Sequence, residues 1–291
     1  MRTLLRNDRG DVRDGWKALF FLLASMGCFV VVGIAGRLWP AAWKPYAPSA
    51  LLIAVLGLLL TALALRLEGG RLRDVGLRFD RRFLSQLALG LLGGALLAAT
   101  SAGLVMLAGV DLVRIEPPSA AAQIKFTMMV LGGAVFEELL FRGYAFQRTV
   151  RGLGAWPALA VFALLFTLGH LPGNTGMEAT LAVNAVAGLV LHAVIMGLIL
   201  LRTGSLAVPI GLHAAWNLVQ GLLGFGVSGL AHPAWFRPDF GSLPGWLTGG
   251  AYGLEASVLP LVLEGLLLVW LLRGPRPTAR LAERRAAHAT A

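Results

Sequence analysis

Charged residues are scarce in this chain. Only 14% of its 291 residues are Asp, Glu, Lys or Arg, whereas soluble globular domains contain about a quarter. Hydrophobic residues make up 57% and the mean hydropathy is +0.75. The scarcity of charge excludes an ordinary soluble domain. It predicts an all-α, polytopic transmembrane helical bundle, because a helix satisfies its own backbone hydrogen bonds inside lipid.

Cysteine is almost absent as well. The single cysteine, Cys28, lies in the first apolar run, so a disulfide framework and a cysteine metal site are excluded. The sequence also lacks the His-Glu-x-x-His pattern that marks the usual zinc proteases. No activated serine or cysteine nucleophile stands out either. Any hydrolytic chemistry must therefore come from other residues.

Long apolar runs predict about eight membrane spans. The fourth run is longer than a bilayer requires, so we expect it to tilt or protrude. The runs are Trp16–Gly36, Ser49–Leu65, Phe83–Ala108, Gln123–Val150, Ala155–Leu171, Ala179–Leu201, Ser205–Val227 and Leu254–Leu272. They divide the chain into residues 1–122 with three spans and a basic segment, 123–227 with four spans, and 228–291 with an aromatic loop, the last span and a basic tail.

The net charge of +10 comes from residues that flank the spans rather than from one patch. This distribution favours membrane topology over nucleic-acid binding. Most of the 25 Lys and Arg residues lie in the N-terminal arm, the segment 66–82, the turns near 150 and 202, and the tail. The positive-inside rule then places both termini in the cytoplasm. We expect a multi-pass protein of the cell membrane whose partner is the lipid bilayer, with no nucleic acid.

The fourth span contains two adjacent carboxylates and an arginine, Glu137, Glu138 and Arg142. A charged group at the centre of a bilayer costs roughly 3 kcal/mol even on the gentlest scale, so such groups usually pair, bind a ligand or take part in chemistry. Glu138 and Arg142 are four residues apart and can form an ion pair on one helix face. Glu137 is rotated by about 100° from Glu138. We therefore expect Glu137 to face a cavity.

Two further spans carry polar residues at helical spacing. Phe166 and His170 are four apart in the fifth span, and His213 and Asn217 are four apart in the seventh. At about 1.5 Å per residue, Glu137, His170 and His213 lie at similar depths. The three helices can therefore bring them to one buried, water-accessible cavity near the middle of the membrane.

The chemistry of this set is restricted. Glu137 beside His170 can hold and deprotonate a water molecule. His213 and Asn217 can donate hydrogen bonds to an oxyanion. Together these groups suit the attack of water on a peptide carbonyl. Alternatively, two imidazoles, one carboxylate and a water form a catalytic zinc shell, which would make Glu137, His170 and His213 metal ligands.

Other polar residues also lie within the predicted spans. We expect His192 to pack between helices. Glu264, in the last span, and Asn184, in the sixth, are candidates for lining the cavity. The aromatic ring of Phe166 is expected to shape the pocket.

The same residues resemble three ordered motifs of the CAAX-protease and bacteriocin-processing (CPBP, or Abi) family, which is related to the eukaryotic endopeptidase that trims prenylated CAAX tails. The motifs cover about residues 123–219 and are Glu137-Glu138-x-x-x-Arg142, Phe166-x-x-x-His170 and His213-x-x-x-Asn217. The resemblance implies that segment 123–227 is the catalytic core of an intramembrane endopeptidase. Its substrate would be a membrane-associated protein or peptide.

The resemblance also implies a role for each matching residue. Water activation falls to Glu137 and His170, oxyanion stabilisation to His213 and Asn217, and support to Glu138 and Arg142. It favours a glutamate-dependent mechanism without a cofactor, with zinc as the alternative.

Two other classes of function stay open at the level of sequence. A proton-coupled transporter could use the same charged groups as a relay, although the sequence shows no inverted repeat. A non-catalytic membrane scaffold or immunity protein could keep the fold without the activity.

Overall fold

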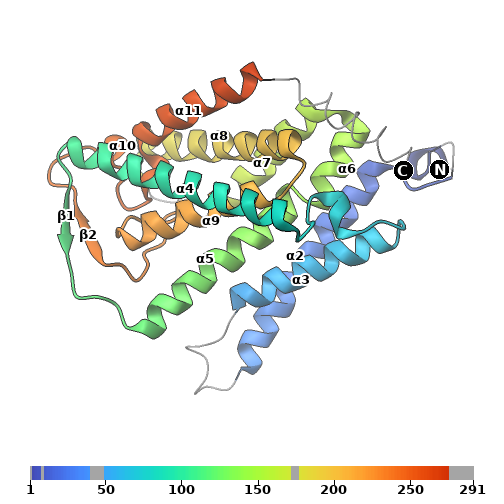
Figure 1. Ribbon diagram of the computed structural model, residues 1–291, viewed down its shortest axis with the longest axis horizontal. Helices are drawn as coiled ribbons and strands as arrows, with labels where there is room; N and C mark the ends of the chain where they lie inside the picture. Colours follow the sequence, from blue (N-terminus) through green and yellow to red (C-terminus); the bar gives the residue numbers. More distant parts are fainter. Residues whose placement is uncertain (1, 8–9, 40–48, 172–176, 275–291) are drawn as a thin grey trace.

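The computed structural model describes residues 2–7, 10–39, 49–171 and 177–274. This part of the chain is mostly helical (Figure 1). The predicted basic tail beyond residue 274 lies outside the described residues. In chain order the elements are α1 (Arg2–Leu5), α2 (Asp14–Leu38), α3 (Ser49–Arg66), η2 (Leu72–Val75), α4 (Arg81–Leu107), β1 (Asp111–Arg114), α5 (Ala120–Phe141), α6 (Tyr144–Leu153), α7 (Ala155–His170), α8 (Ala179–Thr203), α9 (Ala207–Leu222), β2 (Phe236–Asp239), α10 (Gly245–Thr248), η4 (Leu254–Ala256) and α11 (Val258–Arg273).

Short polar side chains begin several of the apolar helices. The Asp80 carboxylate accepts a hydrogen bond from the Phe83 backbone N–H at 2.8 Å at the start of α4. The Ser119 hydroxyl caps α5 and the Ser257 hydroxyl caps α11 in the same way. These caps satisfy backbone donors that the first turn of a helix leaves without a partner.

Helices α4 and α9 cross in close contact in front of the rest of the bundle (Figure 1). A Cβ atom added at Gly94 would collide with the backbone carbonyl of Leu212, and one at Gly211 would collide with that of Leu87. Small residues permit such an approach of two backbones, which is the usual mode of helix association in membranes. This packing holds α9, and with it His213, against a long helix.

Four helices in the described part of the chain are long and apolar enough to cross a membrane: α2, α3, α4 and α8. Helices α7, α9 and α11 have only 16 residues each, or about 24 Å, which is less than a typical hydrocarbon core. Helix α5 has 22 residues but includes Lys125, Glu137 and Glu138. The multi-pass helical class is therefore confirmed in its coarse form, and the number of eight spans stays a prediction.

The fourth predicted span, Gln123–Val150, is wrong as a single helix. The structure divides it into α5 and the amphipathic α6, with the break at Arg142 and Gly143. Gly143 has φ −75° and ψ −129°, and a Cβ atom there would collide with the carbonyl oxygen of Leu139. Glycine tolerates this conformation because it has no Cβ. The break places Arg142 at the end of α5, where its side chain turns into the bundle.

A two-stranded sheet was not expected from the sequence. Strands β1 and β2 pair antiparallel, with Asp111 opposite Asp239 and Arg114 opposite Phe236. They connect the loop after α4 to the loop after α9 at one end of the bundle (Figure 1). The pairing fixes the loop that runs on from α9 beside the catalytic candidates.

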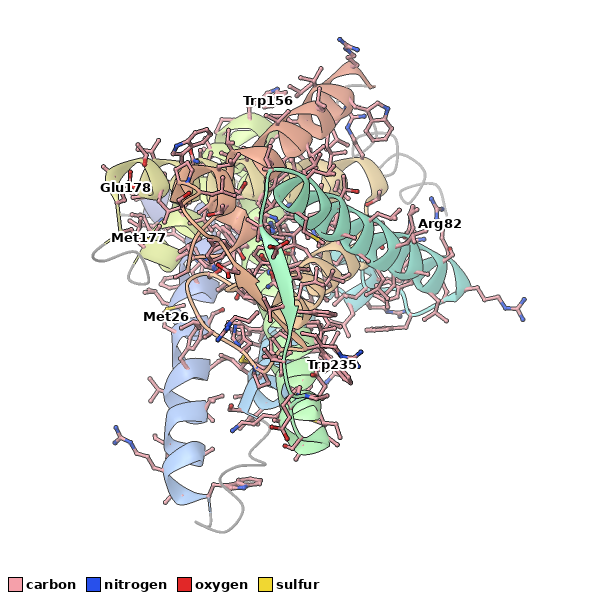
Figure 2. All side chains as sticks on the ribbon, turned by 90° about the vertical axis from the view of Figure 1, so that its left-hand side faces the viewer. Met26, Arg82, Trp156, Met177, Glu178 and Trp235 are labelled. Carbon is pink, nitrogen blue, oxygen red and sulfur yellow. The ribbon has the colours of Figure 1, made fainter. Side chains whose placement is uncertain are left out.

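Large apolar side chains cover the outside of the helices (Figure 2). Met26 on α2 and Trp156 on α7 are 48% and 55% exposed, and Trp235 near β2 is 41% exposed. A soluble monomer rarely presents so much apolar surface. The outer surface therefore agrees with a bundle that is surrounded by lipid.

Candidate active site

The two neighbouring carboxylates at the end of α5 point in different directions, as predicted. Glu138 is fully buried, and its Oε1 atom lies 3.2 Å from Nη1 of Arg142, which is 2% exposed. The Arg142 guanidinium also donates to the backbone carbonyl of Ala193 at 3.4 Å and lies 4.8 Å from the centre of the Phe166 ring. The predicted ion pair thus exists and ties α5 to α7 and α8.

Glu138 has a second partner that the sequence did not indicate. The Nδ1 atom of His213 lies 3.0 Å from Glu138 Oε1, the same oxygen that pairs with Arg142. An ionised carboxylate only accepts hydrogen bonds, so His213 donates from Nδ1. Glu138 therefore fixes the orientation of the His213 ring and directs its Nε2 atom toward Glu137.

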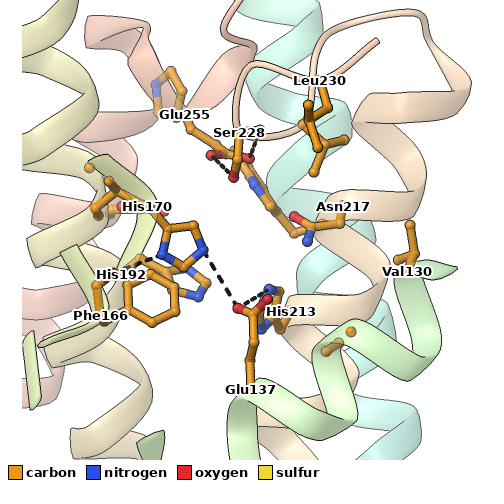
Figure 3. A pocket seen from close by; sticks show the side chains of 18 of the residues that line it. Val130, Glu137, Phe166, His170, His192, His213, Asn217, Ser228, Leu230 and Glu255 are labelled. Carbon is orange, nitrogen blue, oxygen red and sulfur yellow. Dashed lines mark hydrogen bonds and ion pairs between the residues drawn. The ribbon is translucent and has the colours of Figure 1, made fainter. Parts of the chain in front are cut away.

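Glu137 lies between the two predicted histidines. Its Oε2 atom is 3.7 Å from Nε2 of His170 and 3.9 Å from Nε2 of His213. Figure 3 shows the Glu137 carboxylate at the base of a pocket, directed at both rings. The Glu137 side chain is 30% exposed, and its Oε2 atom has no hydrogen-bond partner among the described residues. The distances to both rings exceed a direct hydrogen bond, and they leave room for a small polar ligand beside the carboxylate.

His170 is held from its other ring nitrogen. Its Nδ1 atom lies 2.7 Å from the carbonyl oxygen of Phe166, one turn earlier on α7. Because a carbonyl oxygen only accepts, Nδ1 carries the proton. In the neutral ring, Nε2 is then a hydrogen-bond acceptor that faces Glu137. The backbone of Phe166 thus fixes the tautomer of His170.

These groups line a cavity of about 270 Å³ inside the bundle. Its walls come from α5, α7, α8, α9, the loop after α9, η4 and α11. All four predicted catalytic residues line it, namely Glu137, His170, His213 and Asn217. The fold thus brings together residues that are up to 80 positions apart in the sequence.

Asn217 lies one turn beyond His213 on α9. Its Oδ1 atom accepts a hydrogen bond of 3.5 Å from Gln220 Nε2, and the same nitrogen donates to Glu255 at 2.8 Å. The engagement of Oδ1 leaves the amide N–H₂ group of Asn217 as its donor to the cavity. Asn217 therefore presents the polarity that an oxyanion requires.

Of the other intramembrane polar residues, Glu264 and His192 line the cavity and Asn184 does not. Glu264 lines the cavity, as expected for a candidate. Asn184 does not line it in the described structure, because its amide donates to the Trp246 carbonyl at 3.0 Å outside the cavity. His192 does more than pack between helices. It lines the cavity, and its ring centre lies 5.2 Å from that of His213. A third intramembrane histidine near the same depth was the available signal.

Further cavity residues were missed altogether. Glu255, Ser228 and His232 lie on η4 and on the loop after α9, in segments without a family motif. Burial lowers the pKa of His232, so this ring adds little positive charge at neutral pH. The only signal for Glu255 in the sequence was its position as an acidic residue at the start of the last apolar run, Leu254–Leu272.

A metal ion has a possible set of ligands here. Glu138, His192 and His213 have ligand atoms within 4.8 Å of one another, and they form a candidate metal group in the described chain. This set differs from the predicted one of Glu137, His170 and His213. The Glu138 Oε2 and His192 Nε2 atoms lack hydrogen-bond partners among the described residues, so the donor types fit a zinc ion. However, Glu138 Oε1 already binds Arg142 and His213.

A comparison with protein families supports the resemblance. A family model described as "Type II CAAX prenyl endopeptidase Rce1-like" matches residues 120–219, which run from α5 to α9. The segment includes Glu137, Glu138, Arg142, His170, His213 and Asn217. The match is consistent with the CAAX-protease and bacteriocin-processing family, so the predicted resemblance is confirmed. No curated protein and no solved structure matches the chain.

Proposed function

We propose that this protein is an intramembrane endopeptidase that hydrolyses a peptide bond of a membrane-associated protein or peptide. The observation that supports it most directly is the position of Glu137 Oε2, which lies 3.7 Å from His170 and 3.9 Å from His213 inside a cavity. The match to a family of CAAX prenyl endopeptidases also supports a proteolytic activity. Segment 123–227 is proposed as the catalytic core.

The proposed reaction uses a water molecule between Glu137 and His170. Glu137 takes a proton as the water oxygen attacks the carbonyl carbon, and His170 accepts the water's second hydrogen bond. The carbonyl double bond opens to an oxyanion, which accepts hydrogen bonds from the Asn217 amide and from His213 Nε2. When the tetrahedral intermediate collapses, the C–N bond breaks and the proton on Glu137 passes to the leaving amine.

His213 can serve as a donor only if Nε2 carries a proton. Because Nδ1 already donates to Glu138, donation from Nε2 requires the imidazolium form. The Glu138 carboxylate 3.0 Å from Nδ1 stabilises that positive charge. Glu138 and Arg142 therefore act as positioning residues in the proposed mechanism.

The activity is tested with protein purified in detergent and a panel of quenched fluorescent peptides. Cleavage identified by mass spectrometry supports the endopeptidase. A substrate-dependent proton flux in vesicles, with every peptide left intact, would instead establish a proton-coupled carrier. The absence of both from folded protein would favour the non-catalytic scaffold.

Asn217→Ala is expected to lower turnover by about 10²–10³-fold, as the loss of one oxyanion donor does elsewhere. The thermal unfolding temperature should change little, because the Asn217 side chain makes one long contact of 3.5 Å with Gln220. Asn184→Ala is the matched control, since Asn184 lies outside the cavity, and its activity should equal that of the wild type. Full turnover in Asn217→Ala would remove this residue from the oxyanion site.

We propose that the reaction needs no metal, because Glu137 and His170 can activate water by themselves. Purified active protein should contain less than stoichiometric zinc, and a chelator should leave peptide cleavage unchanged. A zinc ion on either candidate set would lower the pKa of a bound water to about 7 and supply the nucleophile. Loss of cleavage on chelation, with recovery on addition of zinc, would establish the metal mechanism.

We further propose eight spans, with both termini in the cytoplasm of a cell-membrane protein. The support is the concentration of Lys and Arg residues in alternate connecting segments. A cytoplasm-active reporter fused at Arg285 should be active, and an export-active reporter placed within residues 233–244 should also be active. An export-active reporter that works at Arg285 would contradict the orientation.

A further inference from the structure

The cavity has an acidic wall beyond the proposed catalytic groups. Glu255 on η4 and Glu264 on α11 line the same cavity as Glu137. Figure 3 places Glu255 and Ser228 at the end of the pocket opposite Glu137, with Asn217 between them. Glu255 and Glu264 have no part in the proposed hydrolysis.

Glu255 is held in a fixed orientation by neutral donors. Its Oε1 atom accepts hydrogen bonds from Gln220 Nε2 at 2.8 Å and from the Ser228 backbone N–H at 3.3 Å, and its Oε2 atom accepts from the Ser228 hydroxyl at 3.1 Å. These donors orient the carboxyl group and bring no positive charge to it. Gln220 also contacts Asn217, so the acidic wall is connected to the proposed oxyanion site.

Glu264 provides a second carboxyl group in the same cavity, on a different helix from Glu255. Its side chain lines the cavity and is only 7% exposed, and its only electrostatic interaction in the described chain is with the neighbouring acidic group of Glu255. A carboxylate inside a membrane helix is rare and usually marks a site for a ligand or ion. The carboxylate of Glu264 is therefore available to a ligand.

The cavity lining has more acidic groups than fixed positive charges, because its other titratable side chains are histidines and His213 is already paired with Glu138. Three carboxylates line it within the described chain, those of Glu137, Glu255 and Glu264, and none of the described lining residues is Lys or Arg. The nearby guanidinium of Arg142 is already paired with Glu138. A cation is thus the ligand that complements this wall, because opposite charges interact strongly where water is excluded.

We propose that Glu255 and Glu264 form a subsite that binds a cationic group of the substrate peptide. The group is either a Lys or Arg side chain or a free amino terminus, both of which present N–H donors to the two carboxylates. The identification of the ligand as a peptide rests on the proposed function, whereas the preference for a cation rests on the two carboxylates. The subsite would select basic substrates among the apolar peptides of a membrane.

The test compares three matched apolar peptides with wild-type protein in detergent. The first has a blocked amino terminus and one lysine, the second has acetyl-lysine at that position, and the third has acetyl-lysine and a free amino terminus. Binding is measured by displacement of a fluorescent peptide, and cleavage is followed in parallel by mass spectrometry. Binding of the first or the third peptide at least about 30-fold tighter than the second is expected. Tighter binding of the first peptide would identify the cation as a lysine side chain, and tighter binding of the third would identify it as a free amino terminus.

The variants Glu264→Gln and Glu255→Gln should each remove most of this preference, since glutamine keeps the shape but not the charge. Glu264→Asp should retain the preference. Glu116→Gln, at an exposed position, is the matched control. Equal binding of all three peptides to wild-type protein overturns the proposal, whatever the variants do. Cleavage without a charge preference would support the proposed protease and contradict the cation subsite. A charge preference without cleavage would support the cation subsite and contradict the proposed protease.

Discussion

Glu137→Gln is expected to reduce peptide cleavage by about 10²–10⁴-fold, the usual contribution of a general base. Glutamine has nearly the same volume as glutamate, but its amide cannot accept the proton of the attacking water. Glu137 Oε2 lies within 4 Å of both His170 and His213, so the loss of its basicity removes the centre of the arrangement. The measurement is the initial rate of cleavage of the best quenched peptide.

The fold should survive the Glu137→Gln change. The carboxylate has no partner at Oε2 within hydrogen-bond distance in the described chain, so little stabilisation is lost. The thermal unfolding temperature of Glu137→Gln should equal that of the exposed control Glu116→Gln. A folded Glu137→Gln variant that cleaves at the wild-type rate would contradict both the role of Glu137 and the proposed mechanism.

Arg142→Ala is expected to destabilise the protein by about 3–5 kcal/mol, because it leaves the fully buried Glu138 carboxylate without its cation. Glu138→Ala should cost a similar amount, since it leaves the Arg142 guanidinium alone. The double variant should lose less than the sum of the two single losses, because neither Glu138 nor Arg142 is then left buried without the other. The readout is the free energy of unfolding in detergent with increasing denaturant.

The control for the Arg142→Ala variant is the removal of an arginine whose charge is exposed to solvent. Arg73→Ala removes an exposed guanidinium 3.9 Å from Asp74 and should change stability by less than about 0.5 kcal/mol. Strictly additive losses at Glu138 and Arg142 would show that the two side chains do not act as a buried pair. Glu138→Gln should also lower turnover in protein that remains folded, because Glu138 orients His213 at 3.0 Å.

The helix faces that carry the motif residues could be predicted from the sequence because helical spacing is a local property. Positions four apart on a helix share a face, which predicted the Glu138–Arg142 pair. The rotation of about 100° between neighbouring residues predicted that Glu137 faces away from that pair. Charge inside an apolar run is equally visible without a fold. The family resemblance, confirmed by the match to residues 120–219, rests on the same local patterns.

Contacts between helices could not be obtained in this way. The hydrogen bond from His213 to Glu138 joins residues 75 positions apart, and nothing in either motif states which nitrogen faces which oxygen. Glu255 and Ser228 lie outside every motif, and the only signal for His192 was that it is a third intramembrane histidine. Their places depend on the close approach of α4 to α9 and on the β1–β2 pairing, which fix the loop after α9.

The sequence by itself determined that this chain is a helical membrane protein with a set of polar residues at helical spacing, because hydropathy and periodicity are properties of single segments. Only the tertiary structure decided that α5 ends at Phe141, that Glu138 orients His213, and that Glu255 and Glu264 share the cavity of Glu137. These features depend on how separate helices pack, and side-chain packing and backbone conformation at one glycine set them. Local sequence patterns do not specify contacts between residues that are far apart in the sequence.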